Sequence, residues 1–505
     1  MADQPRLLIR ADANAGMGSG HVMRCLALAQ AWQDSGGRAV FATAPPVLLR
    51  ERLRKESFQI CEIDAAPGST EDALQTLTLA REHGARSIAV DGYHFGANFQ
   101  RTLKADGFEV LFLDDYGHSS PYSADWVLNQ NASAQGSAYD KRQSYTQLLL
   151  GPRYCLLRRE FMAWQEWSRD IAPVGHRVLV TMGGSDPENF TRIAIQAVSY
   201  LQDDNLEVDV VVGGANQHSY LAESVAPEGA KKIRLHRDVK HMPELMAAAD
   251  VAISAAGTTA WELCFLGLPS ILVSLAPNQI PIAQELSRQQ CAIHLGDAHD
   301  VSAQELAEQL QALLKSKDQR RAISLRGREL VDGSGAKRVV AVLRGLNLQL
   351  RPVKESDVRL LWEWVNDSQV RAASFSSEPI PWEKHEAWFT SKLTDPDGRI
   401  LIAEDEQGRA IGQFRLDWRS HDDADIDVSV CRECRGRGYG RVLIDMGVSH
   451  AHAERGAVRL HAYVKPENEA SRRSFELARF ENLGQERVNG HYAVHYVRTH
   501  EPDHE

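Results

Sequence analysis

The chain has 505 residues, of which 43% are hydrophobic and 25% are charged, and its formal net charge is −11. This length exceeds what one ordinary core holds, so two to four domains are expected. The acidic balance argues against nucleic acid as a partner, and no apolar run approaches the roughly 20 residues that span a membrane. The first residues lack a signal-peptide pattern, and seven cysteines in so long a chain form no disulfide scaffold, which predicts a cytoplasmic location.

Short apolar runs alternate with helix-like stretches through the first two thirds of the chain. Such alternation predicts an α/β fold of parallel sheets, here as two Rossmann-like halves that face a cleft. The predicted strands are residues 6–10, 39–42, 88–91, 109–113 and 147–150 in the first half, and 177–182, 207–212, 250–254 and 270–275 in the second. Residues 155–175, rich in Arg, Trp and Glu, are predicted to connect the halves.

The turn after the first predicted strand reads GMGSGHVMRC over residues 16–25. Glycines between a strand and a helix let backbone N–H groups meet a phosphate, and His21 is suited to proton transfer near neutral pH. The turn therefore predicts chemistry beside a nucleotide-type leaving group, with a tight turn capped by a histidine as the alternative. Cys25 is expected to pack into the core rather than act as a nucleophile with His21.

A second strand, small-residue turn and helix follow at residues 250–262. The helix start with Thr258 suits a diphosphate, and Glu262, one turn on, is predicted to accept both hydroxyls of a ribose. A first-turn acid favoured by the helix dipole is the alternative for Glu262. Asn278 and Gln279 follow the next strand and are predicted to line the same pocket. Asp114–Asp115, the nearest candidate for a metal loop, is predicted instead to order a loop or to contact sugar hydroxyls.

With Arg10-Ala11-Asp12-Ala13 and Met182-Gly183-Gly184-Ser185-Asp186, these motifs make the first two thirds of the chain resemble a known family. This family comprises the UDP-sugar hydrolases of pseudaminic acid biosynthesis, which are relatives of the MurG-type glycosyltransferases with the GT-B fold. The resemblance implies that UDP is removed from UDP-2,4-diacetamido-2,4,6-trideoxy-β-L-altropyranose without a metal and with inversion, His21 being the base that activates water. It implies UDP-sugar contacts from Gly18, Ser19, Gly20, Arg24, Gly183, Gly184, Ser254, Gly257, Thr258, Glu262, Asn278 and Gln279.

A new pattern begins after a loop-forming segment at residues 332–335 and one more helix. Tryptophans become frequent, and strands are predicted next to one another at 400–404 and 410–418 and further on at 427–430 and 460–464. Between the last two lies a loop, Arg435-Gly436-Arg437-Gly438-Tyr439-Gly440-Arg441, followed by an apolar helix. Glycines before a helix let backbone N–H groups close around a pyrophosphate.

On this strand, loop and helix, residues from about 348 to 505 resemble the GNAT acetyltransferases, which have an α+β fold and bind acetyl-CoA through the loop. Trp364-Val365-Asn366-Asp367 and His385-Glu386-Ala387-Trp388-Phe389 resemble the branch that acetylates the 4-amino group of UDP-linked altrosamine, although ribosomal-protein acetyltransferases share this outline. The resemblance implies acetyl-CoA contacts from Val428, Val430, Arg435, Gly436, Arg437, Gly438, Gly440, Arg441 and Asn468.

One departure concerns the tyrosine that in this family protonates the departing thiolate, because Phe475 stands at that position. Tyr463 and Tyr439 are possible substitutes. The base that deprotonates the amine is open between Asp427, His421 and His385. Further departures are Arg479 in place of a glycine, before the phenylalanine at which the last helix is predicted to end, and a single Cys431–Cys434 pair, for which no metal or redox use is expected.

These observations predict a GT-B fold with halves at 1–170 and 171–345, followed by a GNAT domain at 348–505. The predicted function is bifunctional, acetyl-CoA-dependent N-acetylation followed by hydrolysis of the UDP-sugar, with no metal. Expected partners are UDP-amino-sugars and other enzymes of the same pathway, and neither nucleic acid nor a membrane. The alternatives are a MurG-like glycosyltransferase, a hydrolase of another UDP-amino-sugar, and a GNAT domain that senses acetyl-CoA or acetylates a protein.

Overall fold

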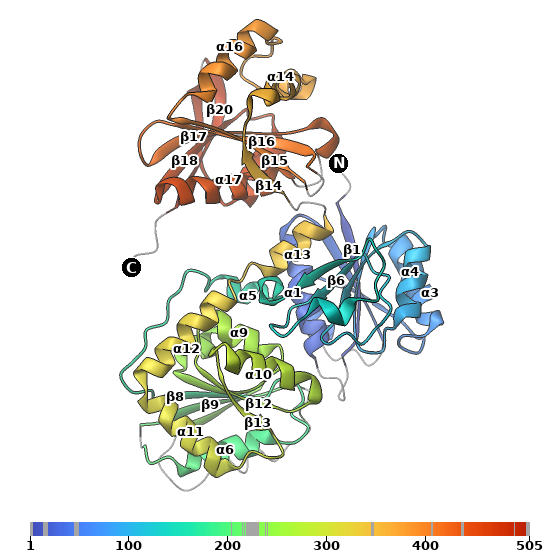
Figure 1. Ribbon diagram of the computed structural model, residues 1–505, viewed down its shortest axis with the longest axis vertical. Coiled ribbons are helices and arrows are strands. Elements are labelled where there is room, and N and C mark those ends of the chain that lie inside the picture. Colours follow the sequence, from blue (N-terminus) through green and yellow to red (C-terminus); the bar gives the residue numbers. More distant parts are fainter. Residues whose placement is uncertain are drawn as a thin grey trace. The chain divides into compact units, whose positions relative to one another are not determined.

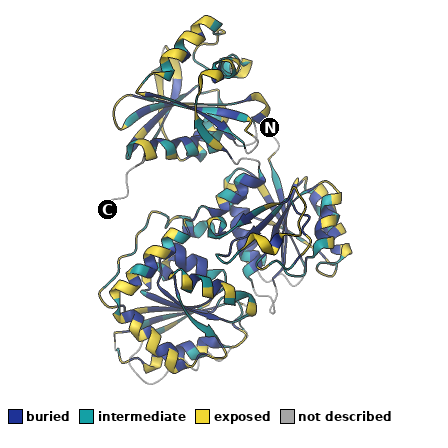
Figure 2. Cartoon of the chain, viewed as in Figure 1, coloured by how far each residue is buried: buried dark blue, intermediate teal, exposed yellow. Residues whose placement is uncertain are grey.

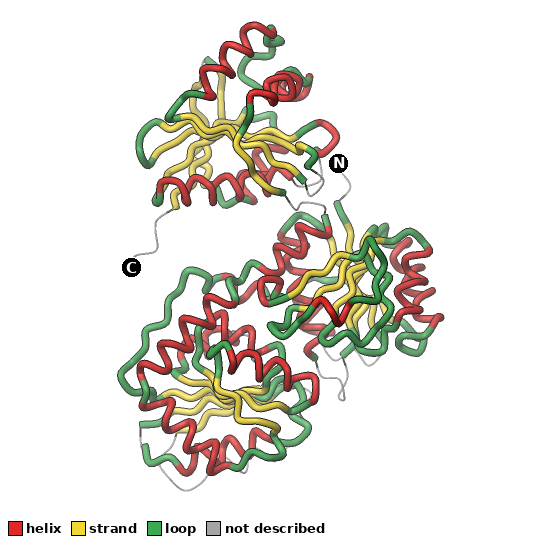
Figure 3. Tube along the Cα trace, viewed as in Figure 1, coloured by secondary structure: helices red, strands yellow, loops and turns green. Residues whose placement is uncertain are grey.

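The structure, a computed structural model, falls into two compact units, Asp3–Val340 and Ala341–Glu505, which are described separately. The residues that it describes are 4–13, 19–44, 50–203, 205–214, 216, 218, 232–237, 239, 241–344, 348–405, 408–435, 439–488 and 490–500. Figure 1 shows the order of the elements along the chain, and Figure 3 shows how strands alternate with helices in the first unit.

The first half of the Asp3–Val340 unit is a parallel sheet with the strand order β3-β2-β1-β4-β5-β6-β7. Its strands are β1 (Arg6–Ala11), β2 (Arg38–Thr43), β3 (Gln59–Glu62), β4 (Ser87–Asp91), β5 (Glu109–Leu113), β6 (Trp126–Asn129) and β7 (Gln147–Leu150). Its helices are α1 (Gly20–Asp34), α2 (Arg50–Lys55), α3 (Thr70–Glu82) and α4 (Ala97–Ala105). All five predicted strands are present. The sequence reading missed β3 and β6, which are only four residues long.

The second half is another parallel sheet, with the order β10-β9-β8-β11-β12-β13. Its strands are β8 (Arg177–Thr181), β9 (Glu207–Val212), β10 (Lys232–Arg237), β11 (Val251–Ala255), β12 (Ser270–Ser274) and β13 (Ile293–Asp297). The described helices of this half and its borders are α5 (Arg159–Met162), α6 (Phe190–Tyr200), α8 (Met242–Ala248), α9 (Thr259–Phe265), α10 (Ile280–Arg288), α11 (Ala303–Lys315), α12 (Lys317–Leu330) and α13 (Gly335–Leu343). The missed strands β10 and β13 are edge strands with polar residues, so they lack the apolar run that marks a buried strand.

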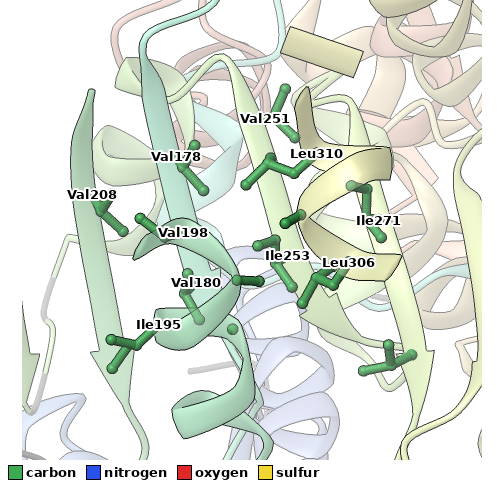
Figure 4. Close-up of a cluster of buried hydrophobic side chains, with 14 of the residues drawn as sticks. Val178, Val180, Ile195, Val198, Val208, Val251, Ile253, Ile271, Leu306 and Leu310 are labelled. Carbon is green, nitrogen blue, oxygen red and sulfur yellow. The ribbon is translucent and has the colours of Figure 1, made fainter. Parts of the chain in front are cut away.

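Helices α6 and α11 cover one face of the second sheet and build its core (Figure 4). Leu306 and Leu310 of α11 pack over Val251 and Ile253, and burial of each leucine contributes about 1.5–3 kcal/mol. Helix α11 begins where the Ser302 hydroxyl accepts a hydrogen bond from the Glu305 backbone N–H. Figure 2 shows the consequence, strands that are dark with buried residues and helices that are exposed on their outer sides.

The Ala341–Glu505 unit has a mixed sheet with the order β14-β15-β16-β17-β18-β20-β19. Its strands are β14 (Gln349–Pro352), β15 (Gly398–Glu404), β16 (Ala410–Trp418), β17 (Asp423–Val430), β18 (Val458–Val464), β19 (Glu481–Val488) and β20 (His491–His500). Its helices are α14 (Val358–Val365), α15 (Ser368–Ala373), α16 (Trp382–Leu393), α17 (Tyr439–Arg455) and α18 (Glu469–Leu477). Strands β17 and β18 are parallel, and the other described pairs in this sheet are antiparallel.

Helices α17 and α18 pack on one face of this sheet, and α14 and α16 pack on the other face at β15 (Figure 1). The prediction that the last helix ends at Phe480 is wrong, because α18 ends at Leu477. Arg479 has a φ of 60°, a left-handed conformation that favours glycine and turns the chain into β19. Within the described part of the chain, no helix has both the length and the apolarity that a membrane span needs.

Replacement of Gly447 by Ala is expected to destabilise the C-terminal unit. A Cβ at Gly447 overlaps ring carbons of Phe414, where α17 crosses β16. Overpacking of this kind costs about 1–3 kcal/mol, which outweighs the roughly 1 kcal/mol that Ala gains over Gly in a helix. Differential scanning calorimetry measures the change. The matched control is Gly440→Ala in the same helix, where the nearest atom to the new Cβ is the Ser474 hydroxyl at 3.1 Å. Equal unfolding temperatures for the two variants contradict the packing argument.

Candidate functional site

His21 lies in the first turn of α1, directly after β1, and its side chain is buried. Its Nδ1 atom is 2.6 Å from Oδ1 of Asp91, the last residue of β4. Strands β1 and β4 are neighbours at the point where the strand order of the sheet reverses. Ligands of parallel α/β sheets bind outside the carboxyl ends of the strands at such a point. The candidate base therefore sits where this fold class places its ligands.

Arg24, one turn further along α1, holds two carboxylates with one buried guanidinium group. Its Nε lies 2.6 Å from Asp91 Oδ2, its Nη2 2.7 Å from Asp91 Oδ1, and its Nη1 2.7 Å from Asp115 Oδ1. Burial alone raises the pKa of Asp91, but the charge of Arg24 and the hydrogen bonds from Arg24 and His21 outweigh burial and lower the pKa well below its usual range. Asp91 is therefore ionised and accepts a hydrogen bond from the N–H group at Nδ1 of His21. This leaves Nε2 as the nitrogen with a lone pair.

Tyr93 extends this network to the second half of the unit. Its hydroxyl donates to Asp115 Oδ2 at 2.7 Å and accepts from Asn278 Nδ2 at 2.8 Å. Its ring meets the His21 ring edge-on, with 4.7 Å between centroids. Asn278 belongs to the single turn Pro277–Gln279 after β12, so the carboxyl-end loops of both sheets contribute to one network.

Two further contacts bring the glycine turns of the halves together. A Cβ built on Gly184 would lie 2.6 Å from the Ser19 hydroxyl oxygen, and one built on Gly20 would lie 3.8 Å from Thr258 Oγ1. A larger residue at position 184 would therefore require the Ser19 side chain to move. Gly183 has a φ of 77°, and the Asp186 carboxylate after it accepts from the backbone N–H groups of Phe190 and Thr191 at the start of α6.

The remaining candidates of the second half lie around the start of α9. Ser254 is buried at the end of β11, Thr258 precedes the helix, and a Cβ on Gly257 would lie 3.8 Å from Gln279 Nε2. Glu262 is buried and its Oε1 is 3.0 Å from Arg158 Nη2. Burial raises the pKa of Glu262 to about 7 although the charge of Arg158 opposes the shift.

The sequence reading missed Asp91, Tyr93, Asp115 and Arg158 as partners of the candidate residues. A carboxylate at the end of a predicted buried strand was the available signal for Asp91. The expectation that Asp114 orders a loop is confirmed, because its Oδ1 accepts from the backbone N–H groups of Tyr116 and Gly117. Gly18, a predicted UDP-sugar contact, lies outside the described residues.

Two of the candidate acetyl-CoA residues, Val428 and Val430, lie in the last part of β17. Strands β17 and β18 pair over Asp423–Asp425 only, whereas β17 runs on through Val428 and Val430. Arg435 follows, with its Nη1 2.7 Å from Asp367 Oδ1 and its Nε donating to the carbonyl oxygen of Val430. The other candidates are Gly436, Arg437 and Gly438, which lie outside the described residues, Gly440 and Arg441 in the first turn of α17, and Asn468, whose side chain caps α18.

His385 does not fit the role of a base. It is buried, its Nε2 is 3.2 Å from the carbonyl oxygen of Val358, and burial lowers its pKa. His421 is exposed, and Asp427 is exposed with its Oδ1 3.1 Å from Gln413 Nε2. Phe475 packs against Phe480 and Tyr496 in the core.

Burial and hydrogen bonding also describe the candidate proton donors and the cysteines. Tyr439 is buried in the core, and the Tyr463 hydroxyl lies 3.1 Å from Arg419 Nη2. Cys25 is buried and burial raises its pKa, which agrees with the expected core position. Cys431 and Cys434 are buried, and burial raises the pKa of Cys431 to about 12. In the portions of the chain that the structure describes, no group of three or more His, Cys, Asp or Glu side chains is arranged to hold a metal ion.

Two segments of the chain match known protein families. Residues 177–331 match the glycosyltransferase family 28 C-terminal domain, and residues 347–481 match the acetyltransferase (GNAT) domain. These matches, with two parallel sheets followed by a mixed sheet, confirm the predicted fold class of a GT-B fold with a C-terminal GNAT domain.

Three relatives cover different shares of the chain. An uncharacterized protein of Methanocaldococcus jannaschii is 22% identical over 84% of this chain and 86% of its own length. The spore coat polysaccharide biosynthesis protein SpsG of Bacillus subtilis is 29% identical over 48% of this chain and 71% of its own. The UDP-2,4-diacetamido-2,4,6-trideoxy-β-L-altropyranose hydrolase of Campylobacter jejuni is 24% identical over 56% of this chain and 96% of its own. The chain therefore joins a homologue of a UDP-sugar hydrolase to an acetyltransferase (GNAT) domain in one polypeptide.

Proposed function

We propose that the chain carries out two consecutive reactions of pseudaminic acid biosynthesis. Residues 348–505 transfer an acetyl group from acetyl-CoA to the 4-amino group of UDP-4-amino-4,6-dideoxy-N-acetyl-β-L-altrosamine. Residues 1–345 then hydrolyse the product, UDP-2,4-diacetamido-2,4,6-trideoxy-β-L-altropyranose, to the free sugar and UDP. The observation that carries the proposal is the buried His21–Asp91 pair, which lies where the strand order of the first sheet reverses. The similarity to the UDP-sugar hydrolase, which extends over 96% of that protein, supports it.

His21 acts as the base in the hydrolytic step. Its Nδ1–H donates to the ionised Asp91, so that Nε2 takes a proton from water as the water oxygen forms a bond to the anomeric carbon. The bond between that carbon and the UDP oxygen breaks on the opposite face, which inverts the anomeric centre. Asp91 stabilises the imidazolium that forms, and Arg24 keeps Asp91 oriented and charged.

Backbone and side-chain hydrogen-bond donors of both halves stabilise the negative charge of the departing UDP. The start of α1 at Ser19 and Gly20 lies beside Thr258, which precedes α9, so two helix starts meet at one place. Preorganised donors of this kind stabilise a developing diphosphate anion. Asn278 and Gln279 add amide groups, and Glu262 accepts the ribose hydroxyls in its ionised form.

The C-terminal domain supplies the acetylation. The described strands β17 and β18 separate beyond Asp425, and the glycine-rich sequence 435–441 extends into the first turn of α17. We assign acetyl-CoA to these residues, where it supplies the acetyl group as a thioester. An N-acetylation of the amine yields the diacetamido sugar named for the hydrolase relative, so the two reactions follow one another.

A glycosyltransferase is the second candidate, because the second half matches a glycosyltransferase domain. In that case a sugar hydroxyl takes the place of water, and UDP is released only when an acceptor is present.

The order of reactions predicts that UDP release depends on acetyl-CoA. With UDP-4-amino-4,6-dideoxy-N-acetyl-β-L-altrosamine as the sole substrate, we expect little UDP, and addition of acetyl-CoA should give the diacetamido sugar nucleotide followed by free sugar and UDP. Mass spectrometry of a single incubation measures all products. UDP release that ignores acetyl-CoA contradicts the order, and a need for an added sugar acceptor supports the glycosyltransferase instead.

Loss of either member of the dyad should abolish hydrolysis while acetyl transfer persists. His21→Asn removes the base and Asp91→Asn removes the charge that fixes its tautomer, so each should lower kcat about 10²–10⁴-fold. UDP release is measured with the diacetamido sugar nucleotide. Asp106→Asn, which changes an exposed carboxylate paired with Arg81, is the matched control and should keep full activity. Intact UDP binding by calorimetry shows that a variant is folded, and undiminished hydrolysis by a folded His21→Asn protein rules the mechanism out.

UDP affinity should rise with pH through about 7. Burial places the pKa of Glu262 near 7, and only the carboxylate form accepts two ribose hydroxyls. As the pH falls below this value, Glu262 becomes protonated and loses acceptor capacity, so affinity should drop. Glu262→Gln should bind UDP about 10–100-fold more weakly above pH 7. Calorimetry across this range compares the two proteins, and because UDP itself titrates in both, the difference reports Glu262. Identical pH dependence in both proteins excludes the assignment.

A further inference from the structure

Four titratable side chains form a continuous chain across four neighbouring strands of the C-terminal sheet. His461 on β18 has its Nε2 3.1 Å from Asp423 Oδ2 on β17 and its Nδ1 2.9 Å from His495 Nε2 on β20. His495 Nδ1 is in turn 3.2 Å from Glu486 Oε1 on β19. The two imidazole rings are nearly parallel, with 5.1 Å between centroids. None of these four side chains was singled out from the sequence.

The distances fix how many protons the pair of rings holds when every contact is a hydrogen bond. Each carboxylate accepts one N–H, from His461 Nε2 and from His495 Nδ1, and the contact between the rings needs one more hydrogen. Three protons on two imidazoles give the pair a single positive charge. When the two rings hold two protons in total, one of the three contacts has no hydrogen and is not a hydrogen bond. When they hold four, two N–H groups face each other between the rings and repel. A pair with two protons therefore completes its hydrogen bonds by taking up a third.

The surroundings place further charges against the pair. Tyr463 stacks on His495 with 4.6 Å between centroids, and Arg419 donates to the Tyr463 hydroxyl and pairs with Asp425 at 2.6 Å. Burial lowers the pKa of His495, Glu486 and Asp425 oppose that shift, and His461 and Arg419 add to it. His495 is therefore subject to opposing influences from β17, β18, β19 and the turn after β16.

The chain of side chains lies beside the place where β17 and β18 separate. His461 is opposite Asp425, the last paired residue of β17, and Tyr463 lies two residues further along the diverging part of β18. The neighbours Leu460 and Ala462 point into the core under α17 and α18, so His461 and Tyr463 face the other side of the sheet. That side carries α14 and α16 at β15 and the exposed carboxylate of Asp427 on β17.

We propose that the His461–His495 pair, held between Asp423 and Glu486, accepts the proton that the acceptor amine releases during acetyl transfer. This rests on the proposed acetyltransferase function. The amine nitrogen, as a free base, forms a bond to the carbonyl carbon of the acetyl thioester, and the carbon–sulfur bond breaks. The proton of the amine passes to the pair, which changes from two protons to three. The thiolate leaves with the electron pair of the broken bond and is protonated from solvent, because Phe475 offers no proton.

The first test is the pH dependence of acetyl transfer to the amino-sugar nucleotide. The rate should rise with pH as the pair loses its third proton. Glu486→Gln removes a charge that favours the protonated pair, so this rise should move to lower pH, a shift that a merely structural role does not produce. His495→Gln and His461→Gln should lower kcat about 10²-fold and leave only the rise that deprotonation of the amine itself produces. His450→Gln changes a histidine on the surface of α17 and is the matched control, with unchanged rate and profile expected.

The second test does not depend on activity. In the full-length protein labelled with ¹³C and ¹⁵N histidine, the ring signals of His461 and His495 should titrate together and change in parallel, and each single substitution should shift the titration of the remaining ring. Independent titration of the two rings, or full acetyl transfer by a folded His495→Gln protein, overturns the relay alone. If the wild-type protein acetylates no amino-sugar nucleotide, the proposed acetyltransferase function fails and the relay fails with it.

Discussion

A single buried arginine determines the geometry of the hydrolase site. Arg24 binds Asp91 and Asp115 with hydrogen bonds of 2.6–2.7 Å, and the side chains of Arg24 and Asp91 are buried. Buried ions are tolerated when they are paired and fully hydrogen-bonded, and removal of one partner leaves an uncompensated charge that costs about 3–5 kcal/mol. Arg24 therefore holds both carboxylates in fixed positions, and the contact with Asp91 holds the His21 ring in one orientation.

The parallel sheets explain why these residues meet. Residues that follow neighbouring parallel strands gather at one edge of the sheet, and His21, Asp91 and Asp115 follow β1, β4 and β5, which are adjacent in the strand order. The sequence supplied the strands and the glycine turn, because both are local patterns. It did not supply Asp91 as the partner of His21, because 70 residues separate them and only the strand order makes them neighbours.

The same reasoning sets the limit of prediction in the C-terminal unit. The strand, glycine-rich turn and helix around Arg435 are contiguous in sequence, so the pattern alone predicts a pyrophosphate-binding turn, and the resemblance to GNAT acetyltransferases adds the candidate acetyl-CoA contacts. The pairing of His461 with His495 depends on β20 entering the sheet between β18 and β19, an order that no local signal contains. His385 was a reasonable candidate by residue type, yet packing between α14 and α16 buries it against a backbone carbonyl.

The charge around His21 also gives a physical reason for the proposed order, in which acetylation precedes hydrolysis. Arg24, Asp91 and Asp115 together carry one net negative charge, which protonation of His21 in the proposed mechanism would neutralise. A sugar that still carries an ammonium group brings a second positive charge toward this site, and a like charge nearby opposes protonation of the imidazole. Conversion of the amine to an amide removes that charge and leaves a neutral group able to donate and accept hydrogen bonds. In the proposed mechanism, protonation of His21 is therefore easier beside the amide than beside the ammonium group.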